Sequence, residues 1–234
     1  MGRAPGRTLT AHWKPGGLSV REVIALVQDA RGLARSPAQS PNSLIRNQPC
    51  PMTLVVAVLV GSLRKDSLTR KVALALATVA PASLKLEIIE IGGLPHYNQD
   101  LDTEIPPPEW VSFRQRVAKA DAALFATPEY NRSVPGVLKN AIDVASRPHG
   151  KSAWAKKPAA VVSVSPGALA AFGANHHLRQ MLVFLDMPTL QQPEMYIGQA
   201  APMFDATGNL TNDSTRTFLT KGMAAFAIWI EKVR

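Results

Sequence analysis

From residue 52 onward, short apolar runs of strand length alternate with longer amphipathic stretches of helix length. Leu54 to Val60 is apolar at every position and rich in valine, which is typical of a strand covered on both faces. Continued along the chain, this pattern predicts strands at 53–60, 84–91, 121–127, 158–165 and 188–191. It predicts helices at 67–80, 107–120, 136–147, 173–186 and 213–232.

This alternation of strands and helices predicts an α/β fold. We expect a flavodoxin-like, doubly wound, five-stranded parallel sheet with helices on both faces, formed by residues 52–234. Sheets of this kind bind ligands beyond the carboxyl ends of their strands. Functional residues are therefore expected in the loops that follow the first, third and fourth strands.

The loop after the first strand has the composition of an anion site. Gly61 allows a sharp turn, Ser62 and Arg64 supply donors, and Ser67 is placed to cap the next helix. A helix N-terminus carries partial positive charge and free N–H groups, which stabilise an anion. The loop matches neither the P-loop nor the dinucleotide fingerprint, and it suits a terminal phosphate monoester better. An ordinary capped turn would have a similar sequence.

The other two loops are suited to a flat ring. The third strand is followed by a polar loop with one aromatic residue, Tyr130, within residues 128–136. The fourth strand is followed by small residues from Ser165 to Leu169, which allow close approach of a planar group. A phosphate joined to a planar heterocycle is a description of FMN.

The composition of the chain limits the kinds of chemistry that it can carry out. The chain has 234 residues, 46% of them hydrophobic, but no run approaching the ~20 apolar residues of a membrane span. Its only cysteine, Cys50, lies outside the patterned region, so neither disulfides nor a thiolate metal cluster are expected. Redox chemistry would therefore need a bound cofactor.

Residues 1–51 differ from the rest of the chain. They hold seven Lys or Arg against two acidic residues, more than half of the formal charge of +9, and one plausible short helix at 20–30. We interpret them as an extension outside the fold, with an organellar transit peptide as the alternative. Because this segment dominates the charge, the basic character is poor support for nucleic-acid binding, and none is expected.

Three segments carry a resemblance to a known family. GSLRKDS, TPEYNRSVPGVLKNAIDVASRP and HHLRQMLVFLDMP resemble the NAD(P)H-dependent FMN reductase family, in its branch of bacterial quinone and chromate reductases. The resemblance spans about residues 52–234. It implies FMN as cofactor, NADPH or NADH as co-substrate, and quinones, flavins, azo dyes or metal oxyanions such as chromate as acceptors. It also implies that the flavin N5 carries the chemistry, with no catalytic side chain and no metal.

The resemblance assigns roles to particular residues. The FMN phosphate would be held by Ser62, Arg64, Ser67 and the backbone of Leu68. The edge of the isoalloxazine would be contacted, largely through main-chain groups, by Pro128, Glu129, Tyr130 and Asn131. The third side of the ring would be closed by Ser165 and Gly167. For Glu129 we expect a structural or interface role rather than that of a general acid. Arg132 is interpreted equally well as a salt-bridge partner or as a contact for the nicotinamide nucleotide.

The resemblance further implies a homodimer, with the helix at 140–147 near the interface, and possibly a tetramer. Two differences between this sequence and the usual family pattern bear on these expectations. Ala170 and Ala171 stand where relatives commonly have a Gly-Gly pair, so their methyl groups are candidates for narrowing the flavin approach or displacing the loop. Gly173 replaces an Arg often used in tetramer contacts, which makes the tetramer less secure than the dimer.

Two other classes of protein fit an FMN site. One is a flavodoxin-type electron carrier, and the other is a sensory module that keeps FMN as a structural ligand. Flavodoxins tend to be acidic and to have longer phosphate loops rich in Ser and Thr, whereas this loop contains Arg64 and Lys65, which favours the enzyme. A small-molecule electron acceptor, no membrane span and a cytoplasmic location complete the expectation.

The proposed boundary at residue 52 predicts the outcome of a truncation. Deleting residues 1–51 should leave both the bound FMN and the melting temperature nearly unchanged, because the patterned core begins after them. Flavin content and thermal unfolding, measured beside the full chain, test this. A large loss of either would show that the segment contributes to the fold.

Overall fold

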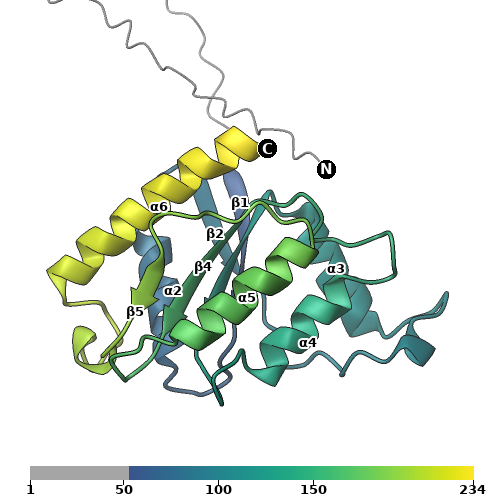
Figure 1. The fold of residues 1–234 in the computed structure, drawn as a ribbon, viewed down its shortest axis with the longest axis horizontal. Helices are drawn as coiled ribbons and strands as arrows, with labels where there is room; N and C mark the ends of the chain where they lie inside the picture. Colours follow the sequence, from purple (N-terminus) through teal and green to yellow (C-terminus); the bar gives the residue numbers. More distant parts are fainter. Residues whose placement is uncertain (1–52) are drawn as a thin grey trace, which may run out of the picture. The chain divides into compact units, whose positions relative to one another are not determined.

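The computed structural model describes residues 53–234, and these form a parallel sheet between two layers of helices (Figure 1). The helix expected at 20–30 lies outside the described residues. The strands are β1 (Leu54–Val60), β2 (Leu84–Ile88), β3 (Ala122–Thr127), β4 (Ala159–Val164) and β5 (Met195–Ile197). The α-helices are α2 (Leu68–Val79), α3 (Pro108–Lys119), α4 (Gly136–Ala145), α5 (Phe172–Phe184) and α6 (Asp213–Val233). Two 3-10 turns are η1 (Gln99–Leu101) and η2 (Ala201–Met203).

The sheet has the order β2-β1-β3-β4-β5, and each neighbouring pair is parallel. The strand order reverses between β1 and β3, which is the switch point of a doubly wound sheet. The flavodoxin-like fold expected from the sequence is therefore confirmed.

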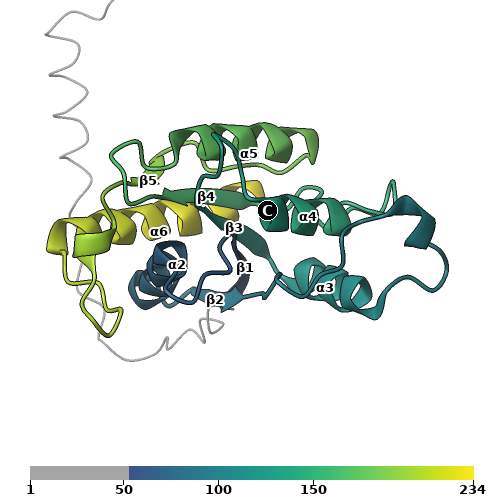
Figure 2. The same ribbon diagram turned by 90° about the horizontal axis from the view of Figure 1, so that it is seen from below.

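Helices cover both faces of the sheet (Figure 2). Side chains of β1 alternate between them: Val56, Val58 and Val60 pack in the core layer beneath α2 and α6, while Ala57 and Leu59 pack beneath α3, α4 and α5. This double burial explains the continuous apolar run that begins the pattern. Within residues 53–234, no helix combines the length and apolarity needed to cross a bilayer.

Helix boundaries follow local capping chemistry. The Ser67 hydroxyl accepts a hydrogen bond from the Arg70 N–H at 3.1 Å, as expected for the cap of α2. Asn212 caps α6 in the same way, through the Thr215 N–H at 2.8 Å. The helices α3, α4 and α5 have no side-chain cap of their own, yet all five helices begin and end within two residues of the sequence prediction.

The fifth strand is the main correction to the sequence prediction. The expected strand at 188–191 makes only one isolated bridge, between Ala159 and Thr189, and the strand itself lies at 195–197. Pro188 begins the expected segment and Pro193 follows it closely; neither has an N–H to donate, which limits ladder pairing there. The second strand also ends earlier than expected, at Ile88, and residues 89–107 form a long connection to α3.

Candidate functional site

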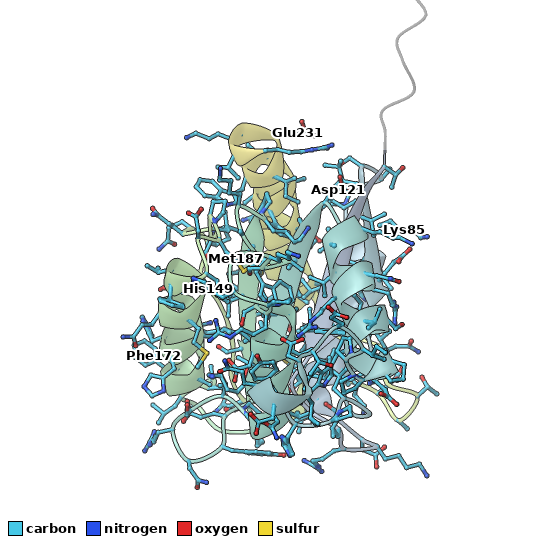
Figure 3. The ribbon with its side chains drawn as sticks, turned by 90° about the vertical axis from the view of Figure 1, so that its right-hand side faces the viewer. Lys85, Asp121, His149, Phe172, Met187 and Glu231 are labelled. Atoms are coloured by element: carbon cyan, nitrogen blue, oxygen red, sulfur yellow. The ribbon has the colours of Figure 1, made fainter. Side chains whose placement is uncertain are left out.

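The strand register brings three loops to one edge of the sheet. Val60 is paired with Ala126, and Thr127 is paired with Ser163, so β1, β3 and β4 end at nearly the same level. Figure 3 shows Phe172, the first residue of α5, at one end of the sheet, and Asp121 at the opposite end. The segments 61–67, 128–135 and 165–171 therefore share the carboxyl edge.

The loop after β1 is held tightly at its start and open at its tip. The Gly61 N–H donates to the Ala126 carbonyl at 2.8 Å, and a Cβ at Gly61 would lie 3.2 Å from Pro128. Ser62 and Ser67 are buried, whereas Arg64 is exposed. Of the first N–H groups of α2, which have no partners within the helix, that of Arg70 is capped by Ser67. The remaining donors at the start of α2 are a suitable position for an anion.

A cavity of about 440 Å³ joins this loop to the loop after β3. Arg64 lines it from the β1 side, and Tyr130, which is 53% exposed, lines it from the β3 side. Gly61 and Gly136 contribute walls without side chains. Of the residues predicted for the site, Arg64 and Tyr130 line this cavity, whereas Ser62, Ser67, Ser165 and Gly167 do not. A cation and an exposed aromatic ring on one cavity are compatible with FMN, which joins a phosphate to a flat ring.

The loop after β3 contains a strained two-residue turn. Tyr130 and Ser133 exchange backbone hydrogen bonds, both 3.0 Å long, across Asn131 and Arg132. These two central residues have φ values of 50° and 65°, as in a type I′ turn. Left-handed backbone at residues other than glycine is uncommon, and its strain clusters at functional sites.

Glu129 ties this loop to α5. Its carboxylate accepts a hydrogen bond from the Ala174 N–H at 2.9 Å, and its side chain is only 14% exposed. Ala171, at the N-cap of α5, has no side-chain acceptor, so a residue from another loop caps the helix. The close packing of the turn at 129–132 against α5 requires a glycine at position 173, because a Cβ there would lie 2.9 Å from the Arg132 carbonyl oxygen. The Ser133 hydroxyl adds a second link, 3.1 Å from His177 Nδ1.

The loop after β4 is compact and partly strained. The Ser165 hydroxyl bonds to both the carbonyl and the N–H of Gly167, at 2.9 and 3.1 Å. Ala170 and Ala171 adopt left-handed φ values of 51° and 57°, the conformation that a Gly-Gly pair would adopt without strain. Both alanine side chains are buried, so their methyl groups point into the protein and do not line the open edge.

The sequence interpretation missed two buried asparagines. Asn140 accepts from the Tyr97 N–H at 2.8 Å and donates to the carbonyls of Leu94 and Pro95, which fixes the connection after β2. Asn175 donates to Ser163 at 3.1 Å, linking α5 to β4 beside the site. The only sequence signal for either residue is an amide at a helix position that faces the core.

Two tyrosines near these elements have raised pKa values. Burial, followed by the nearby Asp102 carboxylate, raises the pKa of Tyr97. Burial, followed by hydrogen bonding to Glu194, raises the pKa of Tyr196. Tyr97 packs against Trp110 and donates to Asp102 at 3.2 Å, so it is part of a packed loop.

Taken together, the doubly wound sheet, the anion seat and the ring-sized loops define the class of flavin-nucleotide-binding proteins. A family model described as NADPH-dependent FMN reductase matches residues 54–202. The chain belongs to this family of oxidoreductases.

Characterised relatives agree with this family. A quinone reductase of Pseudomonas putida is 62% identical over 176 residues, covering 75% of this chain and 94% of the relative. A 2-hydroxy-1,4-benzoquinone reductase of Burkholderia is 46% identical over 183 residues, covering 78% of this chain and all of the relative.

A similar structure has also been solved. FerB, a flavoenzyme NAD(P)H:(acceptor) oxidoreductase from Paracoccus denitrificans, superposes with a TM-score of 0.72 at 44% identity. The superposition covers 77% of this chain and 98% of FerB. The flavodoxin-like fold is thus shared with an enzyme of the same broad activity.

The phosphate assignment predicts the effect of removing Arg64. Arg64→Ala should weaken FMN binding by about 2 kcal/mol, roughly thirtyfold, because a charge-assisted contact is lost. Titration of apoprotein with FMN, followed by flavin fluorescence, measures the change. Lys71→Ala, a basic residue further along α2, is the matched control and should bind FMN normally. Equal affinity of the Arg64 variant and the parent would exclude this residue from the phosphate site.

The helix cap supplied by Glu129 predicts a graded loss of stability. Glu129→Ala should destabilise the protein by about 1–2 kcal/mol, because the Ala174 N–H loses its acceptor. Glu129→Gln keeps an acceptor oxygen and should lose clearly less. Urea unfolding of the flavin-free proteins makes the comparison. If neither substitution lowers the free energy of unfolding, the hydrogen bond between Glu129 and the Ala174 N–H does not stabilise the protein.

Proposed function

We propose that this chain is an FMN-dependent NAD(P)H:quinone oxidoreductase. The observation that carries the proposal is the cavity between Arg64 and Tyr130, which joins the loops after β1 and β3 at the switch point of the sheet. When bound there, FMN supplies hydride transfer from a nicotinamide to an acceptor through N5. The identities of the relatives support quinones as the acceptor class.

The chain's own residues bind and orient the cofactor. Ser62, Arg64, Ser67 and the first N–H groups of α2 would hold the phosphate, and the loop at 128–131 would edge the ring. Ser165 and Gly167 would close the third side of the ring, and free backbone N–H groups of these loops would stabilise negative charge that develops on the reduced flavin. The hydrogen bonds of Glu129 and Ser133 to α5 fix the position of the loop after β3, which favours a preorganised site.

The acceptor range is proposed to extend to free flavins, azo dyes and metal oxyanions such as chromate, since an open ring face admits many oxidants. We further propose a homodimer that uses the α4 side of the molecule, and a cytoplasmic location. A tetramer is less favoured, because Gly173 is enclosed by the turn at 129–132 and offers no side chain for contacts. The electron-carrier alternative is weakened by the reductase relatives and by the basic phosphate loop.

Anaerobic mixing with a nicotinamide tests the proposal directly. The purified flavoprotein should lose its flavin absorbance promptly on addition of NADPH or NADH, and a quinone should then restore it. Steady-state rates with both substrates varied should give the parallel lines of ping-pong kinetics.

The control is the same mixture without nicotinamide, kept anaerobic for the same time. An unchanged flavin spectrum with both NADPH and NADH would count against the reductase and favour an electron carrier or a sensory module. Bleaching that no quinone reverses would reject quinones as the acceptor.

A further inference from the structure

The segment that follows β5, residues 198–200, packs against the loop that follows β4. Strand β5 lies beside β4 at the edge of the sheet (Figure 1), and the backbone pairing continues past the ends of both strands. The Ser165 N–H donates to the Ile197 carbonyl at 3.0 Å, and the Ala200 N–H donates to the Ser165 carbonyl at 3.1 Å. The Gln199 N–H donates to the Gly167 carbonyl, also at 3.1 Å. Three backbone hydrogen bonds therefore fix the start of the loop.

The same bonds determine which backbone groups of the loop remain available to a ligand. The carbonyls of Ser165 and Gly167 are occupied by the 198–200 segment, and the Gly167 N–H donates to the Ser165 hydroxyl. Within the part of the chain that the structure describes, the N–H groups of Ala168 and Leu169 donate to no protein group. Both residues are exposed, Leu169 by 64%. Hydrogen bonds from this loop to a bound ring are therefore expected from Ala168 and Leu169.

Gly198 lies directly against the loop. A Cβ at this position would lie 3.0 Å from the carbonyl oxygens of both Gly167 and Ala168, and 3.3 Å from the Ala170 Cβ. The φ of Gly198 is outside the left-handed range, so its own backbone does not require a glycine. The lack of space does, because a methyl group here would displace the loop by a few tenths of an ångström.

The next residue shows that the segment is itself held in place. Gln199 adopts a left-handed conformation, with a φ of 49°. Such a conformation is unfavourable for residues other than glycine and persists where surrounding contacts impose it. The hydrogen bonds of Gln199 and Ala200 to the loop supply those contacts. Because the Gln199 side chain is exposed, the segment acts through its backbone.

We propose that Gly198 is a positioning residue for the candidate flavin site. Its small size lets the loop after β4 lie where the N–H groups of Ala168 and Leu169 reach the ring. The inference rests on the proposed FMN-dependent function, and it adds to that function a residue outside the three site loops. Gly198 acts through the loop and is assigned no contact with the cofactor.

A displaced loop should affect the reduced flavin more than the oxidised flavin. Hydride transfer from NAD(P)H brings two electrons and one proton to the ring, leaves NAD(P)+, and gives the ring a negative charge. Hydrogen bonds to a charged acceptor are roughly twice as strong as those between neutral groups. Misplaced donors therefore weaken binding of the reduced form more, which lowers the midpoint potential of the bound flavin.

Gly198→Ala tests the inference in the flavin-loaded protein. The added methyl group should weaken binding of oxidised FMN by about threefold and of reduced FMN by about thirtyfold. This tenfold difference corresponds to a two-electron midpoint potential about 30 mV lower than that of the parent. Titration of apoprotein with FMN and equilibration with a reference redox dye measure the two quantities. Gly93→Ala is the matched control, because a Cβ there meets nothing within 4 Å, and it should match the parent.

A second variant separates positioning from general stability. Gln199→Gly relieves the left-handed strain and keeps the N–H that donates to Gly167. It should leave the FMN affinity and the midpoint potential unchanged, whatever its effect on thermal unfolding. If Gly198→Ala changed only the unfolding temperature, or weakened both flavin forms equally, Gly198 would have a purely structural role and the inference would be wrong.

Hydrogen exchange in the parent protein gives a measurement that needs no variant. Binding of FMN should slow exchange in a peptide covering residues 166–171 by at least about threefold, because two of its amides gain an acceptor. Anaerobic reduction should slow it further. Unchanged exchange in a protein that binds FMN and is bleached by NADPH would reject this inference and retain the proposed function. A parent protein that binds no FMN would reject both.

Discussion

The register of three parallel strands is the constraint on which the rest of the structure depends. Since β1, β3 and β4 end at the same level, their following loops begin side by side and can enclose one ligand. Gly61 permits this arrangement, because a side chain there would press against Leu138 at 3.1 Å and Pro128 at 3.2 Å. The loops after β1, β3 and β4 are therefore brought together by backbone pairing, before any ligand contributes.

The site loops stabilise one another rather than being stabilised separately. The helix α5 begins at a left-handed alanine and takes its cap from Glu129, which lies 45 residues earlier in the chain. The turn that carries this carboxylate is itself strained at Asn131 and Arg132. Such strain persists only where surrounding contacts determine the conformation, and the links from Glu129 and Ser133 provide those contacts. These links therefore hold the strained turn in one fixed geometry beside the candidate flavin site.

Local signals made most of the fold predictable. Strand β1 is visible as a run of valines, and Ser67 and Asn212 mark the starts of their helices. The last strand was placed too early: the segment 188–191 meets β4 at the single Ala159–Thr189 bridge, but the paired strand begins only after Pro193. The contacts of Asn140 and Glu129 could not be predicted from the sequence, for another reason. Each joins segments more than 40 residues apart, and no local pattern records such a pairing.

The departure at Gly173 and the geometry of the turn at 129–132 are best understood as one structural feature. An arginine at position 173 would place its Cβ 2.9 Å from the Arg132 carbonyl oxygen and 3.0 Å from the Glu129 carboxylate. Real Cβ atoms do not approach backbone oxygens so closely, so the turn would have to move. In this chain Arg132 lies on the turn itself, with its guanidinium 3.8 Å from Glu129. The glycine at position 173 therefore allows the turn to close against α5.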